Sequence, residues 1–314
     1  MGDESRDLSP IFYGGTLNVK ALRNAVTLEN TRNNVLTAKF TGIKAGWQQH
    51  ILLTSDVHFD SPYCDREMYK RHLERAVGLD ALIFDNGDWF DAMQGREDRR
   101  RNQSERRKEL NETAYTDALV REGATFLKDY AAWIAFLGEG NHEASVKEKV
   151  ETNLTARLAE RLREQHKGIT HAGAYSGWLW LTFQKTTAVQ WSTRIYHHHG
   201  AGGGGPMTHG VLDTRRQASY LPNADVIWNG HTHTSFLLST SRLRLNKEGA
   251  EVLDRVDYVR TAGYKDEWTG KSADGYGYSF QRTKMNPPSM KGSVLMRLWY
   301  EGGEIRREFT EWKY

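Results

Sequence analysis

The sequence predicts an α/β protein in which two sheets pack against each other. In the first half of the chain, short apolar runs alternate with helical patterns, which is typical of parallel strands joined by right-handed crossovers. After Trp178 the pattern changes to closely spaced short strands, and no Pro- or Ser-rich linker divides the two halves. We therefore expect a single domain over residues 46–314, preceded by an N-terminal extension over residues 1–45.

The first half contains three strands, each followed by a helical pattern. Apolar runs at 51–54, 81–84 and 133–137 predict the strands, because each is short and ends in polar residues. Helical patterns follow at 64–79, 116–130 and 146–162. In the last of these, apolar side chains at every fourth position predict one long amphipathic helix.

The second half is predicted to form a series of strands over 178–183, 188–200, 224–233, 235–245 and 256–264. The final segment, 293–312, has Gly302 and Gly303 between two alternating runs, which predicts a hairpin. Residues 1–45 are polar and weakly patterned, so they either pack on the domain or lack regular structure. The charge-dense segment 95–110 is expected to be a solvated helix or loop, and contact with a phosphate backbone is the minority alternative.

Composition narrows the class of protein. The 314 residues include 43 Lys and Arg against 40 Asp and Glu, and the net charge of +3 does not by itself indicate nucleic-acid binding. The single cysteine, Cys64, excludes an internal disulfide framework and fits a reducing compartment. The acidic N-terminus resembles no targeting signal, and no apolar run is long enough to span a membrane. We expect a cytoplasmic protein that does not bind a membrane.

Side chains that can bind metals gather where the predicted strands end. The five groups are Asp56-Val57-His58, Gly87-Asp88, Gly140-Asn141-His142-Glu143, His197-His198-His199-Gly200 and Gly230-His231-Thr232-His233. In an open α/β sheet, ligands bind beyond the carboxyl ends of the strands, where such loops meet. Mixed oxygen and nitrogen donors suit divalent manganese, iron or zinc better than calcium or magnesium. The sequence therefore predicts a metal centre at the C-terminal ends of the strands.

These five motifs, in this order over roughly residues 50–265, resemble the calcineurin-like metallophosphoesterase family. The resemblance implies a four-layer α/β/β/α sandwich of two mixed sheets flanked by helices, with a dinuclear metal site at the strand C-terminal ends. It implies two divalent ions, with manganese preferred and iron, zinc or nickel as alternatives. One ion would be held by Asp56, His58, Asp88 and His233, and the other by Asp88, Asn141, His199 and His231. His198 and His197 remain alternatives to His199 within the triple.

The resemblance also assigns roles outside the ligand set. It implies that His142 contacts the phosphate and protonates the leaving group, and that Asp91 orients His142. The arginine that follows this acid in the protein-phosphatase branch is absent, since position 92 is Ala92. We interpret His198, Gly202 and Gly203 as candidate substrate contacts, because glycines let a loop approach a phosphoryl group closely. A mobile lid or a simple linker is the alternative for the glycines.

The predicted function is hydrolysis of phosphodiesters in a nucleotide or nucleic acid, with Trp89, Phe90 and Trp268 as candidate stacking residues. Phosphomonoesters and cyclic nucleotides are alternative substrates. A non-catalytic scaffold with the same fold is the alternative from another class. The sequence carries no signal for the oligomeric state.

Overall fold

The computed structural model describes residues 26–32, 34–95, 98, 106–202, 207–208, 210–246, 248–268 and 288–313. One of its two mixed sheets has six strands, in the order β13 (Glu304–Lys313), β12 (Gly292–Glu301), β3 (Gln48–Thr54), β4 (Leu82–Asp85), β5 (Ile134–Leu137) and β6 (His171–Ala172). Strands β3 to β6 run parallel to one another, and the apolar sequences of β3, β4 and β5 predict this arrangement. The two-residue strand β6 has no such sequence pattern.

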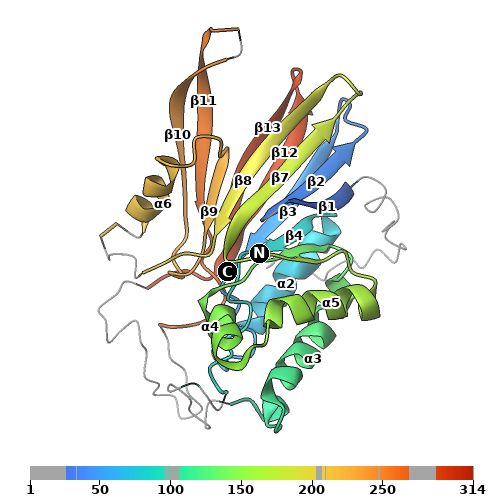
Figure 1. The fold of residues 1–314 in the computed structure, drawn as a ribbon, viewed down its shortest axis with the longest axis vertical. Coiled ribbons are helices and arrows are strands. Elements are labelled where there is room, and N and C mark those ends of the chain that lie inside the picture. The colour runs from blue at the N-terminus through green and yellow to red at the C-terminus, as the bar shows by residue number, and fades with distance from the viewer. Residues whose placement is uncertain are drawn as a thin grey trace, which may run out of the picture.

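The second sheet has seven strands, in the order β1 (Val26–Arg32), β2 (Val35–Thr41), β7 (Ser176–Gln184), β8 (Gln190–His198), β9 (Val226–Asn229), β11 (Glu251–Arg260) and β10 (Phe236–Leu245). Strands β8, β9 and β11 are mutually parallel, so their C-terminal ends lie at the same edge of the sheet. This edge faces the C-terminal ends of β3 to β5 in the other sheet (Figure 1).

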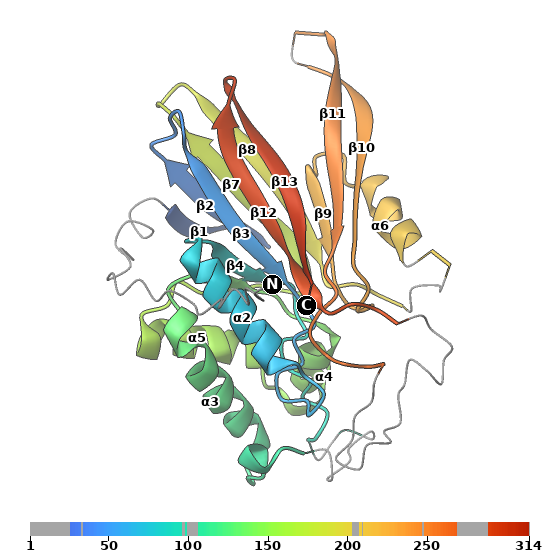
Figure 2. The ribbon, with the colours of Figure 1, turned by 180° about the vertical axis from the view of Figure 1, so that it is seen from behind.

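The helices lie outside the two sheets, which confirms the predicted four-layer class. They are α2 (Arg66–Gly78), α3 (Tyr115–Leu127), α4 (Asn141–Val150), α5 (Leu154–His166) and α6 (Val211–Ala218), with short 3₁₀ turns at Lys108–Leu110 and Lys128–Tyr130. Figures 1 and 2 show α2, α3 and α5 on the side of the six-stranded sheet, whereas α6 lies beside β9, β10 and β11. Within the described residues, α6 is the helix of the fourth layer.

A large apolar cluster joins the two sheets and the helices on the six-stranded sheet. Phe40 of β2 stacks on Phe183 of β7 with ring centroids 5.3 Å apart. The sheets are also joined by a charged contact, since Arg307 of β13 donates to the buried Asp257 of β11 at 2.7 Å. A smaller cluster, which includes Ile227 of β9, lies on the α6 side. The two sheets therefore form one body with a shared core.

Residues 26–32 and 34–41, which lie within the expected N-terminal extension, belong to the seven-stranded sheet or its first turn. They form β1 and β2, and β2 pairs in parallel with β7 from Val35 to Thr41. The sequence pattern does not reveal these strands, because their apolar side chains alternate with polar ones over only a few residues. Residues 1–25 lie outside the described residues, so the remainder of the predicted extension stays a prediction.

The long helix predicted over 146–162 is wrong, because the chain forms two helices there. Helix α4 ends at Val150, and Glu151 adopts a left-handed conformation with φ of 54°. Asn153 then begins α5, since its side chain accepts a hydrogen bond from the Ala156 amide at 2.9 Å. The i+4 pattern runs across this break, so apolar spacing alone could not reveal it.

The other element predictions are confirmed within a few residues. The 293–312 hairpin is formed by β12 and β13, with Gly302 and Gly303 at positive φ in the turn. Among the described residues, no helix combines the length and apolarity that crossing a membrane requires.

Replacing Asn153 by alanine should destabilise the protein by about 1 kcal/mol, because it removes the acceptor that caps α5. Urea denaturation followed by circular dichroism measures this difference. Asn153→Asp is the matched control, because it keeps an acceptor oxygen at the N-cap. Equal loss in both variants would contradict the capping role.

Candidate metal centre

Six loops from the two sheets meet between the facing strand ends. From the six-stranded sheet come the loops after β3, β4 and β5; from the seven-stranded sheet come those after β8, β9 and β11. They carry all seven predicted ligands, which are Asp56, His58, Asp88, Asn141, His199, His231 and His233. Six of these residues, together with His142, form three groups, and within each group the donor atoms lie within 4.8 Å of one another. The groups are Asp56, His58 and His233; His58, Asp88 and His142; and Asp88, His199 and His231.

Backbone hydrogen bonds fix the loops to one another. The amides of Asp56 and His58 donate to the carbonyls of Gly87 and Asp88 at 2.9 and 3.0 Å, which joins the first two loops. The His231 amide donates to both carboxylate oxygens of Asp56 at 2.9 and 3.0 Å, which joins the two sheets. The loops therefore hold the ligand side chains in place before any ion binds.

Five of the predicted ligands adopt a left-handed backbone. The φ values are 52° for Asp56, 49° for His58, 52° for Asp88, 73° for His231 and 53° for His233. This conformation costs non-glycine residues on the order of 1–3 kcal/mol each, and it persists where the surroundings enforce it. Such residues cluster at functional sites. Here the strained backbone turns donor side chains from different loops toward one point.

The donor set fits a pair of divalent cations. The Nε2 atoms of His58 and His233 lie 3.2 Å apart, a separation that suits two ligands of one ion at about 2.0–2.1 Å from each nitrogen. The His199 Nε2 lies 3.1 Å from Asp88 Oδ2. In the described part of the chain, the buried Asn141 Oδ1 has no hydrogen-bond partner. A buried polar atom without a partner is costly, so a cation beside Asn141 would satisfy it.

The electrostatics of the site also favour cations. Asp56 and Asp88 are both almost completely buried. Burial alone would raise the carboxyl pKa, but the nearby imidazoles hold the pKa of both below its usual range. In turn, burial disfavours protonated His199, whereas the Asp88 and Asp56 carboxylates raise its pKa to about 10. The paired carboxylates thus attract positive charge, which bound ions would supply.

The structure distinguishes the three consecutive histidines. His199 Nδ1 lies 2.7 Å from the Asn86 carbonyl, so this nitrogen carries the proton and Nε2 is left to face Asp88. His197 is buried elsewhere, with Nδ1 3.0 Å from Asn86 Oδ1 and its ring against Phe136. His198 alternates to the other face of β8 and packs edge-on against Tyr175. Of the three, the geometry brings His199 to the centre.

His142 lies at the rim of the same centre. Its Nε2 is 3.8 Å from Asp88 Oδ2, and its backbone amide donates to Asp88 Oδ1 at 2.9 Å. Its Nδ1 is 2.5 Å from the backbone carbonyl of Asp91. A carbonyl can only accept, so Nδ1 carries a proton and Nε2 is the nitrogen available to a reacting oxygen.

The expected role of Asp91 needs correction. Its carboxylate does not contact His142; Oδ1 lies 2.8 Å from Nδ1 of the predicted ligand His58 and 2.7 Å from the Lys265 ammonium. Asp91 therefore orients His142 through its backbone carbonyl and faces His58 with its side chain. Sequence spacing places Asp91 near both histidines but cannot say which one its carboxylate reaches.

Two buried acids outside the predicted set hold the loops. Glu143 accepts hydrogen bonds from the amides of Asp88, Phe90 and Gly140 at 3.0, 2.8 and 3.0 Å. Asp60 accepts from the amides of Asp91 and Ala92 at 2.7 and 3.0 Å. Burial and the Asp91 charge raise the pKa of Asp60 to about 6. Glu143 stands at the third helical position after the N-cap residue Gly140, where an acidic side chain can accept from the N-cap amide, and this spacing is visible in the sequence.

The remaining candidates divide between surface and core. Gly202 is exposed with φ of 73°, and a Cβ placed on it would meet no other atom within 4 Å, while Gly203 lies outside the described residues. Their role in substrate binding stays a prediction. Trp89 and Phe90 are buried, and Trp89 stacks on Phe59 at 4.8 Å, so a base-stacking role for these two is wrong. Most of the Arg-rich segment also lies outside the described residues.

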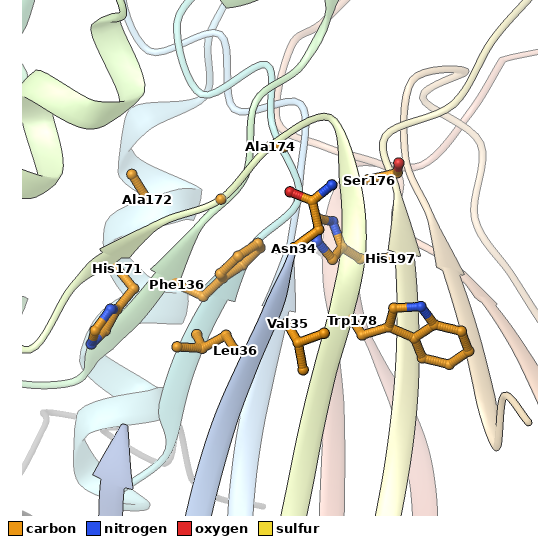
Figure 3. Close-up of a pocket in the computed structure, with 11 residues that line it drawn as sticks. Asn34, Val35, Leu36, Phe136, His171, Ala172, Ala174, Ser176, Trp178 and His197 are labelled. Atoms are coloured by element: carbon orange, nitrogen blue, oxygen red, sulfur yellow. The ribbon is translucent and has the colours of Figure 1, made fainter. Parts of the chain in front are cut away.

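His197 lines a cavity of about 70 Å³, and none of the predicted metal ligands is among the residues that line it (Figure 3). Its lining comes from the starts of β2 and β7, from β5, β6 and β8, and from the segment after β6. Phe136 and Trp178 are among its lining residues. His197, the first histidine of the triple, thus lines this cavity and contacts Asn86, away from the predicted metal centre.

Replacing Gly230 by alanine should weaken Mn²⁺ binding by roughly tenfold or more. A Cβ there would lie 2.6 Å from both Asp56 Oδ2 and Ser55 Oγ. Overpacking costs about 1–3 kcal/mol, and about 1.4 kcal/mol corresponds to tenfold in an equilibrium constant. Titration of metal-free protein in a calorimeter measures the affinity. Gly78→Ala is the control, since nothing lies within 4 Å of its Cβ position. Unchanged Mn²⁺ affinity in Gly230→Ala would contradict the prediction, because it would mean that Asp56 moves away from the added Cβ without loss of binding.

Several solved structures are similar to this chain at low sequence identity. One is a predicted phosphoesterase from Streptococcus pneumoniae TIGR4, with 11% identity, coverage of 85% of this chain and 100% of that chain, and a TM-score of 0.30. Another is vacuolar protein sorting 29 from Cryptosporidium parvum, with 12% identity, coverage of 85% and 100%, and a TM-score of 0.35. A third is a metallophosphoesterase from Sphaerobacter thermophilus, with 12% identity, coverage of 85% and 89%, and a TM-score of 0.31. These TM-scores are too low to support an argument. No curated protein matches the sequence.

The family model for calcineurin-like phosphoesterases matches residues 49–235. This range contains all seven predicted ligands and His142. The match covers more than half of the chain, and the chain therefore belongs to the calcineurin-like phosphoesterase family.

Proposed function

We propose that this protein hydrolyses phosphodiesters of nucleotides or nucleic acids with two divalent ions, of which manganese suits the donors best. The observation that carries the proposal is the gathering of six predicted donors, with Asn141 Oδ1 from a neighbouring loop, unpartnered within the described chain, beside a histidine whose Nδ1 is held by a carbonyl. The six are Asp56, His58, Asp88, His199, His231 and His233. When bound, the ions would supply Lewis acidity, which polarises the phosphoryl group and lowers the pKa of a water molecule.

The residues of the chain would position and protonate the substrate. Asp56, His58, Asp88 and His233 would hold one ion, and Asp88, Asn141, His199 and His231 the other. In its protonated form, His142 would donate from Nε2 to the departing oxygen, because Nδ1 is held by the Asp91 carbonyl. No nucleophilic side chain is required for this reaction.

The choice of a diester rests on charge. A monoester brings about two negative charges at neutral pH, whereas a diester brings one. Among the described residues near the centre, the Lys265 ammonium contacts Asp91, and the Arg260 guanidinium donates to Thr232 and Thr214. Ala92 stands where the protein-phosphatase branch has its phosphate-clamping arginine. Because these two cations already contact side chains of the protein and position 92 lacks an arginine, we favour the substrate that carries the smaller negative charge.

Hydrolysis of bis(p-nitrophenyl) phosphate and of p-nitrophenyl phosphate in Mn²⁺ tests the proposal. We expect faster turnover of the diester, and a loss of at least about 10²-fold in Asp88→Asn, because removal of an electrostatic partner of the transition state costs this much. Asp117→Asn is the matched control on the surface. Faster monoester turnover would favour a phosphomonoesterase, and no turnover by metal-loaded protein would favour the scaffold alternative.

His142→Asn should lower kcat/KM by an amount that depends on the leaving group. General acid catalysis contributes on the order of 10²–10⁴-fold, and a poor leaving group depends on it most. The loss should therefore be small for p-nitrophenyl esters and large for alkyl or nucleoside esters. A series of diesters with leaving groups of increasing pKa measures this dependence. A uniform loss across the series would contradict the proton-donor role.

A further inference from the structure

Each histidine of the predicted first metal site has a carboxylate behind it. His58 Nδ1 lies 2.8 Å from Asp91 Oδ1, and His233 Nδ1 lies 3.4 Å from Glu267 Oε2. The side chains of Asp91 and Glu267 are 7% and 20% exposed, so solvent screens neither contact fully. Both contacts are ion pairs rather than aligned hydrogen bonds, because neither Nδ1 has a hydrogen-bond partner among the described residues. Each ring lies with Nδ1 on the side of an acid and Nε2 toward the centre, where the two Nε2 atoms lie 3.2 Å apart.

The predicted second metal site is supported differently. The Nδ1 of His199 lies against a backbone carbonyl, that of Asn86, at 2.7 Å. Asn141 contributes a neutral oxygen, and the carboxylate of Asp88 is shared with the first site. His199 thus has a neutral carbonyl behind its Nδ1, where both histidines of the first site have a carboxylate.

Glu267 belongs to residues 263–267, which contact Asp56 of the first site. The Tyr264 amide donates to the Asp56 carbonyl at 3.0 Å, and Gly263 packs so closely that a Cβ there would lie 2.6 Å from Asp56 Cβ. The next residue, Lys265, holds the Asp91 carboxylate at 2.7 Å. Residues 263–267 therefore connect the two acids to the ligand loop of Asp56.

A carboxylate behind a ligating histidine fixes its tautomer and orientation, makes the other nitrogen a better ligand and adds attraction for the cation. Loss of such a partner typically weakens metal binding by about 10–100-fold. A neutral backbone carbonyl also fixes the tautomer and orientation of a histidine, but it adds no negative charge beside the cation.

We propose that Asp91 and Glu267 are positioning residues of the first metal site and make it the tighter of the two. The ions then bind in two steps, first at Asp56, His58, Asp88 and His233, and second at the site that contains Asn141. This inference rests on the two-metal centre of the proposed function. Glu267 acts through His233 and Asp91 through His58, without contact to the substrate.

Calorimetric titration of metal-free protein with Mn²⁺ tests the inference. The native chain should show two binding steps of different affinity. Glu267→Gln and Asp91→Asn should each weaken the tighter step by about 10–100-fold and change the weaker step by less than about threefold. Asn141→Ala should do the reverse. Thermal unfolding of each metal-free variant shows whether the fold is retained.

Asp266→Asn is the matched control, because it removes a carboxylate one residue away that caps the Trp268 amide instead of facing a histidine. Both binding steps should be unchanged in it. A single step in the native chain, or equal weakening of both steps in Glu267→Gln and Asp91→Asn, would overturn the inference. The titration contains no substrate, so its failure together with Mn²⁺-dependent diester hydrolysis would leave the proposed function intact.

Discussion

The burial of two carboxylates, Asp56 and Asp88, between the ends of two sheets is the constraint on which the rest of the centre depends. An ionised carboxylate removed from water is costly unless hydrogen bonds and positive charge replace its hydration. Backbone amides of His231 and His142 donate to these acids, and imidazoles from four loops surround them. Divalent ions would supply the remaining positive charge, so the fold of the site and its expected metal binding have the same electrostatic cause.

The backbone of the site adapts to this constraint. Five donor residues adopt left-handed conformations, which are unfavourable in isolation and require tight support. The support comes from close glycine contacts, such as Gly230 against Asp56, and from Glu143 and Asp60, which collect backbone amides from neighbouring loops. Metal binding then needs little rearrangement, because the cost of ordering the ligands is met when the chain folds.

Asp91 links the predicted metal ligand His58 to the proposed proton donor His142. Its carboxylate faces His58, its carbonyl holds His142 and its amide is held by Asp60. A displacement of this one residue would change both the affinity for an ion and the direction of the donated proton. The proposed roles of Asp91 and Glu267 extend the site beyond the atoms that would touch an ion or a substrate.

The sequence predicted most strands and helices after residue 45, the family motifs and the candidate donors, because these depend on local patterns: apolar runs, and polar residues where each run stops. Strands β1, β2 and β6 carry no such pattern. The sequence could not locate the break at Asn153, since a capping hydrogen bond does not alter apolar spacing. It could not choose between His197 and His199, which share a strand face, because the Asn86 carbonyl that orients His199 belongs to another loop. Only the tertiary structure joined His233 to Glu267 and Asp91 to Lys265, since the pairing of charged side chains far apart in sequence depends on how the loops of two sheets meet.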